Sequence, residues 1–171
     1  AGTVDPPSDY TRKNPILYVA ANNYEPVEID FGESLKPSGW LQNVGVHFSY
    51  RYNRLFIAEY TRGNVPKARV WTVDMPVTDG SNWNVVLEKE IPVPYASGFK
   101  HFHTVQGDPF NPVLYASSGD SAMDSYLWYS VDGGSTFEQI DEPNNAKYRM
   151  LNMVFTKDNV WWASDDWREK H

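Results

Sequence analysis

The sequence predicts an all-β fold built from short antiparallel strands, and three observations support this. Aromatic residues make up 15% of the 171 residues, with 7 Trp and 11 Tyr. The 11 Gly and 12 Pro are spread along the chain and punctuate runs rich in β-branched and aromatic residues. Helical periodicity is almost absent. We therefore expect many strands joined by turns.

Twelve runs are expected to form strands, because each combines β-branched or aromatic residues with a nearby turn signal. In chain order they are 16–21, 26–31, 43–49, 54–60, 68–74, 82–91, 102–106, 113–118, 126–132, 136–140, 151–156 and 160–166.

The expected strands recur in groups of four. "HFSYRYNRLFIAEY", "HTVQGDPFNPVLYASSGD" and "LNMVFTKDNVWWASDD" each predict a strand, a tight turn and a strand, and a third and fourth strand follow the first two. A repeating unit of four antiparallel strands is typical of a β-propeller blade. The predicted division is the end of a preceding blade plus a connection (1–42), one blade (43–98), a second blade (99–146) and the first half of a further blade (147–171).

The stretch "SVDGGSTF" (130–137) has the residues of a stapled bend between two strands. The Asp132 carboxylate can accept backbone N–H bonds across the turn, and Gly134 can supply a positive φ. The full set of expected structural residues is Ser130, Asp132, Gly134, Thr136 and Phe137, of which Thr136 closes the turn and Phe137 fills the gap between neighbouring strands.

This bend matches the S/T-x-D-x-G-x-T-W/F pattern, and the chain resembles the sialidase-like superfamily of BNR/Asp-box β-propellers. The phrases "IAEYTRG", "HFHTVQGDPF", "LYASSGD", "YRMLNMVFT" and "VWWASDD" are similar to a bacterial and phage-associated branch, and the resemblance covers roughly 43–168. The stretch "TVDMPVTDGSNW" looks like a degenerate copy of the bend that keeps Asp74, Gly80 and Trp83.

The resemblance implies a propeller that acts on glycans, as sialidases, other exo-glycosidases and some polysaccharide lyases do. It also implies that the bend lies on the outer edge of a blade, away from the chemistry. The F/Y-R-I-P phrase and the arginine cluster of true sialidases are missing, so sialidase activity itself is not expected.

The first strand of a propeller blade lines the central channel, so residues near its start are candidates for a site. His101 and His103 lie there in the second blade and, being two apart, are expected to share a face. His47 lies on the equivalent strand of the first blade. A polysaccharide lyase would use His103 as the base, Tyr60 to protonate the leaving oxygen and Arg149 to hold a uronate carboxylate.

A glycoside hydrolase would instead pair Glu59 with Asp120 or Asp166. His101, His47 and the two aspartates are also candidate substrate-binding residues. The alternative is structural: the histidines hydrogen-bond neighbouring blades, and the aspartates cap backbone amides in turns. An H-x-H pair can chelate zinc, but the sequence locates no third ligand, so no metal and no cofactor are predicted.

The tryptophans gathered late in the chain are expected to form core between blades. This set comprises Trp128, Trp161, Trp162 and Trp167. The alternative is a solvent-facing platform on which sugar rings stack.

Charge and composition limit the partners. The net charge is -7 and no Lys/Arg cluster is present, so no nucleic-acid partner is expected. No apolar run is long enough to span a membrane. The absence of Cys excludes disulfides and thiolate metal sites. The expected partner is a polysaccharide or glycan. Because the strands do not complete a ring, a second chain, further copies or a missing segment is also expected.

Two function classes stay open at this point. The first is a glycan-processing enzyme, either a polysaccharide lyase or a glycoside hydrolase, acting on an acidic polysaccharide. The second is a non-catalytic carbohydrate-binding or structural module of a virion or cell surface. Both imply a secreted or extracellular protein with glycan recognition at its centre.

Overall fold

The computed structural model describes residues 17–20, 26–29, 39–40, 45–61, 67–75, 84–90, 101–119, 125–140 and 146–164. Within these ranges the chain consists of antiparallel β-strands, turns and the short 3-10 helix η4 (Ala146–Tyr148). The predicted all-β class is confirmed. No helix in the described part is long and apolar enough to cross a membrane.

Two four-stranded antiparallel sheets form the centre of the molecule, and in each the strands lie side by side in chain order. The first sheet has the order β4 (Val46–Ser49), β5 (Arg54–Ala58), β7 (Lys67–Asp74) and β8 (Asn84–Glu90). The second has the order β9 (Phe102–Gly107), β10 (Leu114–Ser118), β11 (Leu127–Ser130) and β12 (Glu138–Gln139). Each sheet is a meander of the kind that short turns allow.

Three two-stranded ladders accompany these sheets. They are β1 (Leu17–Ala20) with β2 (Pro26–Ile29), β3 (Gly39–Trp40) with β6 (Tyr60–Thr61), and β13 (Met153–Phe155) with β14 (Val160–Trp162). Strand β3 was not predicted, because two residues that include a glycine carry no periodic signal. Its pairing with β6 places Trp40 opposite Tyr60.

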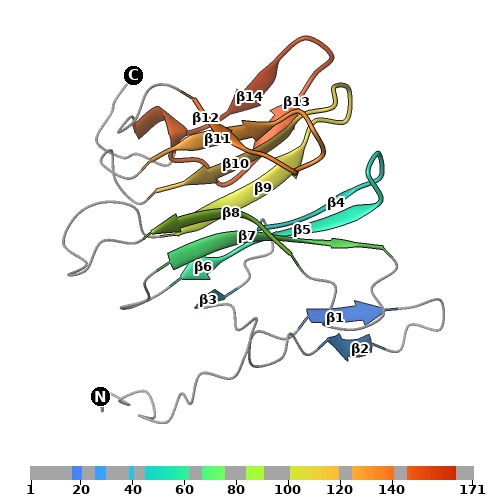
Figure 1. The fold of residues 1–171 in the computed structure, drawn as a ribbon. Helices are drawn as coiled ribbons and strands as arrows, with labels where there is room; N and C mark the ends of the chain where they lie inside the picture. The colour runs from blue at the N-terminus through green and yellow to red at the C-terminus, as the bar shows by residue number, and fades with distance from the viewer. Residues whose placement is uncertain are drawn as a thin grey trace, which may run out of the picture.

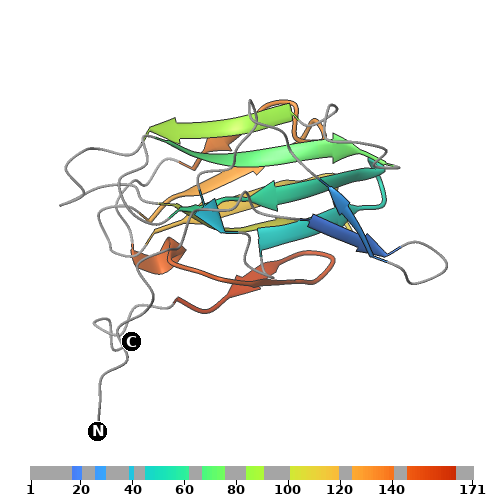
Figure 2. The same ribbon diagram turned by 90° about the horizontal axis from the view of Figure 1, so that it is seen from below.

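The two four-stranded sheets pack face to face (Figures 1 and 2). Because side chains alternate along a strand, one face of each sheet contributes to a shared core. The core residues are Phe56, Ala58, Ala68 and Val70 from the first sheet and Phe102, Val105, Leu114, Ala116 and Trp128 from the second. The first sheet also buries its opposite face, where Ile57, Trp71 and Val73 are at most 2% exposed.

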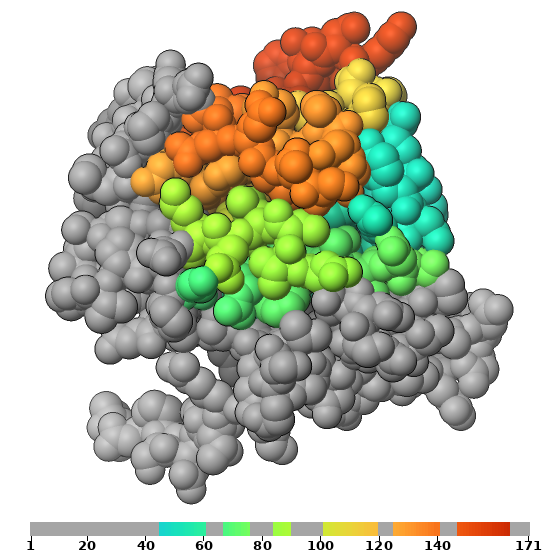
Figure 3. Space-filling model, viewed as in Figure 1, coloured from blue at the N-terminus to red at the C-terminus, as the bar shows by residue number. Residues whose placement is uncertain are grey.

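The β13–β14 ladder packs on the outer face of the second sheet. Met150 and Met153 form a smaller core there with Leu127 and Tyr148. The link is also polar, because Ser117 Oγ on β10 donates to the carbonyl of Met150 at 3.0 Å. In Figure 3 the segment 146–164 projects at the top of the face shown.

The expectation of a buried tryptophan cluster is correct for Trp128 and wrong for two other members. Trp128 is 4% exposed, whereas Trp161 is 60% exposed and Trp162 is 38% exposed. Trp161 lies opposite Val154 on the face of the ladder that points away from Met153, and Val154 is 62% exposed. Trp167 lies outside the described residues.

Asp132 organises the bend between β11 and β12. Its carboxylate accepts hydrogen bonds from the Thr136 hydroxyl at 2.7 Å, the Thr136 amide at 2.9 Å and Ser130 Oγ at 2.8 Å. Ser130 Oγ also accepts a bond from the amide of Gly134 at 2.9 Å. These bonds, the Thr136 hydroxyl first, lower the pKa of Asp132 from 3.8 to about 2. Gly134 adopts the positive φ of 82°, which favours glycine.

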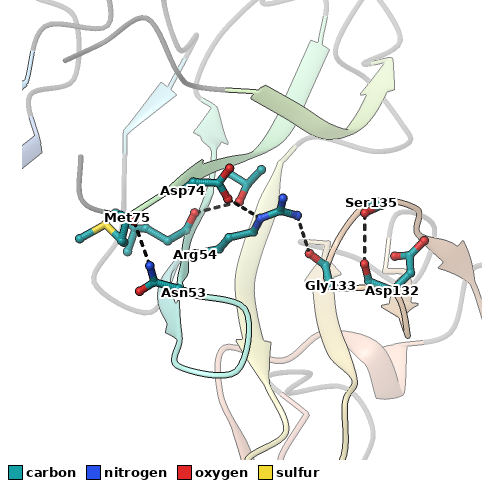
Figure 4. A network of polar contacts seen from close by, with 9 residues as sticks. Asn53, Arg54, Asp74, Met75, Asp132, Gly133 and Ser135 are labelled. Carbon is teal, nitrogen blue, oxygen red and sulfur yellow. Dashed lines mark hydrogen bonds and ion pairs between the residues drawn. The ribbon is translucent and has the colours of Figure 1, made fainter. Parts of the chain in front are cut away.

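The same bend contacts the first sheet. Arg54 donates through Nε to Asp74 Oδ1 at 2.6 Å and through Nη1 to the carbonyl of Gly133 at 3.3 Å (Figure 4). Phe137 packs against the shared core. Asp74, which the sequence predicts to be part of a degenerate bend, therefore binds Arg54. The same arginine reaches the bend organised by Asp132. The other two residues of that degenerate bend, Gly80 and Trp83, lie outside the described residues.

Candidate functional site

A cluster of Tyr60, His101 and His103 lies where the first sheet meets the second. The amide of Phe102 donates to the carbonyl of Glu59 at 3.0 Å, and the amide of Glu59 donates to the carbonyl of Arg69 at 2.9 Å. The first bond ties the end of β5 to the start of β9, and the second ties the same residue to β7. Residues that are distant in sequence therefore become neighbours at one end of both sheets.

The three rings of the cluster are in contact. The ring centroids of Tyr60 and His101 are 3.8 Å apart and those of His101 and His103 are 4.9 Å apart. Tyr60 and His103 are stacked at 6.2 Å. The Nε2 atoms of the two histidines are 3.0 Å apart, which is hydrogen-bond distance. The two histidines do point to a common side, as the spacing predicts.

A β-bulge at His103 helps to direct its ring. On β10, Ser117 pairs with Thr104 and Ser118 pairs with Phe102, so His103 is the extra residue between two consecutive pairs. A bulge of this kind bends the strand and re-aims a side chain, and bulges are over-represented beside active sites. Sequence periodicity cannot reveal the bulge, because Phe102 and Thr104, on either side of His103, are both residues of β9.

Burial divides the cluster into an interior part and an exposed part. His101 and His103 are each 3% exposed and Glu59 is fully buried. Tyr60 keeps intermediate exposure. A ligand that approaches from solvent would thus meet Tyr60 first, and the two imidazoles lie behind it.

Arg149, the predicted carboxylate-binding residue, lies between Tyr148 and Met150 on the connection from η4 to β13. The Met150 carbonyl accepts the Ser117 hydroxyl, and Ser117 pairs with the residue that follows His103. The Arg149 backbone therefore lies against the second sheet near the end of β9 that carries the bulge. Its side chain keeps intermediate exposure.

His47, on β4, lies near the end of β9 that is farther from the cluster. Its Nε2 atom lies so near Gly107, the last residue of β9, that a Cβ added there would clash with it. A Cβ added to Gly45, two residues before His47, would in contrast be 3.8 Å from the carbonyl of His103. It is therefore Gly45, and not His47, that lies beside His103. Four residues of strand separate His103 from Gly107, or about 13 Å at the usual rise. The structure does not bring His47 into the histidine cluster.

Instead, His47 lines a hollow of about 530 Å³ between the β4–β5 turn and the β9–β10 turn. Tyr50, 90% exposed, and Arg51 contribute to its wall, together with Asp108. Tyr52 also lines the hollow, and its hydroxyl donates to the carbonyl of Pro112 in the β9–β10 turn at 3.3 Å. Burial lowers the pKa of His47 below its ordinary 6.5.

Two predicted site residues, Asp120 and Asp166, lie outside the described residues, and with them the predicted pairing of either carboxylate with Glu59. In the part of the chain that the structure describes, no group of three or more His, Cys, Asp or Glu side chains could hold a metal ion.

Sequence reasoning missed the aromatic hollow. Its signal is "YRYN" (50–53), a turn with two tyrosines and an arginine between β4 and β5. A turn between two strands places such side chains together at the surface, where they become candidates for a ligand.

Comparisons of the chain with protein-family models, with curated proteins and with solved structures found no match. Function must therefore be argued from the site.

Proposed function

We propose that this chain is part of an extracellular β-propeller that recognises an acidic polysaccharide, with Tyr60, His101 and His103 at the recognition site. The observation that carries the proposal is the 3.8 Å contact between Tyr60 and His101, which joins the end of one sheet to the start of the next. Residues at this junction in a propeller meet at the mouth of the central channel.

The arrangement of the sheets supports the propeller. The two sheets are consecutive four-stranded meanders stacked face to face, and a third pair of strands stacks on the second sheet. Their first strands are neighbours, since His47 of β4 lies against Gly107 of β9. Blades packed around an axis have these relationships.

The exposed face of β13–β14 supports a ring with further blades. Val154 and Trp161 are exposed on the side where a next sheet would pack. Two four-stranded sheets do not close a ring, because propellers have at least about four blades. The proposal therefore includes further sheets from a second chain, more copies or another segment, and native mass spectrometry of the assembly tests it.

The chemistry of the cluster supports recognition of a sugar. Tyr60 offers an aromatic face and a hydroxyl, the combination that stacks on a sugar ring and hydrogen-bonds it. His101 packs against one face of the Tyr60 ring and holds it in place, so a sugar ring in this proposal stacks on the opposite face. Arg149 supplies the positive charge for a uronate carboxylate in this proposal.

A panel of uronate-containing and neutral polysaccharides tests the proposal by isothermal titration calorimetry. We expect the protein to bind at least one uronate polymer, and Tyr60→Ala to weaken that binding about tenfold or more. Tyr129→Ala is the matched control, since Tyr129 on β11 is a partly exposed tyrosine outside both the cluster and the hollow. Absence of binding to every acidic polymer, or equal affinity of wild type and Tyr60→Ala, would overturn the proposal.

The 3.0 Å contact between the two imidazoles favours a second candidate, a polysaccharide lyase. His103 would take the proton next to the uronate carboxylate and could pass it to His101. The carbon–oxygen bond then breaks, a carbon–carbon double bond forms, and Tyr60 returns a proton to the leaving oxygen. Ultraviolet absorbance of the new double bond, lost in His103→Gln, supports catalysis, whereas binding without product supports a non-catalytic module.

A further inference from the structure

We propose that His101 and His103 chelate one divalent transition-metal ion through their two Nε2 atoms. The H-x-H spacing by itself predicts no metal, because it locates no third ligand. The inference does not rest on glycan recognition.

The first argument is the convergence of the two nitrogens. In a regular strand, side chains two apart leave the backbone about 6.6 Å from each other and run parallel. Here the Nε2 atoms are only 3.0 Å apart. The bulge at His103 accounts for this convergence, because it bends the strand locally and tilts that ring relative to its place in a regular strand.

Second, two arrangements can be compared with the observed ring geometry: two imidazoles that only hydrogen-bond each other, and two imidazoles that bind one ion. Rings that face each other head-on across a 3.0 Å hydrogen bond would have centroids about 5.3 Å apart. If both rings bound one ion with N–metal distances of about 2.1 Å and an N–metal–N angle of about 90°, their nitrogens would be about 3.0 Å apart. Their centroids would be about 4.6 Å apart. The observed centroid separation is 4.9 Å. This value lies between the two, so the rings are not head-on but converge at an angle, as chelation of one ion requires.

The third argument is the support around the pair. Both imidazoles are buried, and the Tyr60 ring packs on His101 at 3.8 Å. A ligand whose ring is held in place loses little freedom on binding a metal, which favours chelation. The main-chain bond from Phe102 to Glu59 fixes the segment between the two histidines.

The ligand set indicates which ions fit. Imidazole nitrogens suit Cu²⁺, Ni²⁺ and Zn²⁺, and an angle near 90° suits the octahedral or tetragonal geometry of Ni²⁺ and Cu²⁺ better than tetrahedral zinc. Among the residues that the structure describes, no third His, Cys, Asp or Glu joins the two imidazoles in a group that could hold a metal. The affinity should be weaker than that of a closed site with three or four protein ligands.

Metal binding and the lyase role of His103 exclude each other. An ion on both Nε2 atoms occupies the lone pair that a general base needs. The loaded protein should therefore show no base catalysis by His103, whatever its affinity for glycans.

Isothermal titration of the chelator-treated protein with NiCl₂, in the absence of any glycan, tests the site. We expect one ion per chain for wild type and at least about a tenfold loss of affinity for His101→Gln and for His103→Gln. His47→Gln and His171→Gln are matched controls that alter the other two histidines of the chain and should keep the affinity. Binding that is absent in wild type, or that survives both cluster variants, overturns the proposal.

A second measurement on wild type covers the case in which the cluster variants do not fold. Electron paramagnetic resonance of the protein loaded with one equivalent of Cu²⁺ counts the coordinated nitrogens. Two imidazole nitrogens, retained in His47→Gln and His171→Gln, support the site. One nitrogen or none shows that the two histidines form only a hydrogen-bonded pair. A failed glycan titration leaves both metal readouts unaffected.

Discussion

The backbone of Gly134 rests directly on the ring of Phe56 in the neighbouring sheet. A Cβ added to Gly134 would be 2.5 Å from Cε1 of Phe56 and 3.3 Å from Cδ1 of Leu114. The bend stapled by Asp132 is therefore more than a turn within its own sheet. It also closes one end of the core that the two sheets share.

Gly134→Ala should destabilise the protein. The left-handed backbone costs an alanine about 1–2 kcal/mol, and overpacking against the Phe56 ring adds about 1–3 kcal/mol. Chemical denaturation followed by tryptophan fluorescence measures the loss. Ser135→Ala, an exposed neighbour in the same bend, should change the free energy of unfolding by less than about 0.5 kcal/mol. Equal stability of Gly134→Ala and wild type would contradict the packing described.

Asp132→Asn should remove a part of the stability that depends on pH. The folded pKa of Asp132 is about 2 against an ordinary 3.8, so the charged carboxylate stabilises the fold above pH 3.8 and this contribution is lost as pH falls through about 2. The difference in melting temperature between wild type and variant should be largest near neutral pH and shrink between these two values. A difference that is constant with pH would show that the charge of Asp132 is not involved.

Arg54→Gln should weaken the contact between the two sheets by a small amount. Its pair with Asp74 is partly exposed, so the loss should be about 0.5–1 kcal/mol and should decrease at high salt. A double-mutant cycle with Asp74→Asn separates the ion pair from the bond to the Gly133 carbonyl. If the arginine also holds the next bend, Arg54→Gln should cost more than Asp74→Asn. Arg51→Gln, in the adjoining turn, serves as the control.

His47 should make stability fall as the solution is acidified. Its folded pKa is lowered by burial, so below about 6.5 the unfolded chain binds the proton more readily than the folded chain. The contribution of neutral His47 to the free energy of unfolding is then fully present above about pH 6.5. It decreases as the pH falls toward the lower folded pKa. Arg51 and Asp108, which line the same hollow, carry the nearby charges. His47→Gln should flatten the difference in free energy between pH 7.5 and about 5, measured by urea denaturation.

Most strands could be predicted because their signals are local. The run "ARVWTVD" combines β-branched and aromatic residues, and the structure has β7 at Lys67–Asp74. The run "YLWYSVD" was expected to continue to 132, but β11 ends at Ser130. Ser130 and Asp132 there hydrogen-bond within the bend, which withdraws the backbone from the ladder.

The exposure of Trp161 and Trp162 could not be predicted from residue type. Tryptophan is usually buried, and the same prediction is correct for Trp128. The difference is that Trp128 lies in the second of two sheets that pack on each other, whereas Trp161 lies on the outer face of a two-stranded ladder. Burial depends on what covers a face, and that is a property of the assembled layers.

The sequence by itself determined the all-β class, the grouping of strands and the residues of the Asp132 bend, because each depends on residues close together in the chain. Only the tertiary structure decided that Tyr60 joins His101 and His103 while His47 lies against Gly107, at the other end of β9. It also revealed the bulge that brings two Nε2 atoms to 3.0 Å. Contacts between sheets and a one-residue shift in register arise from how separate segments pair, and no local pattern encodes them.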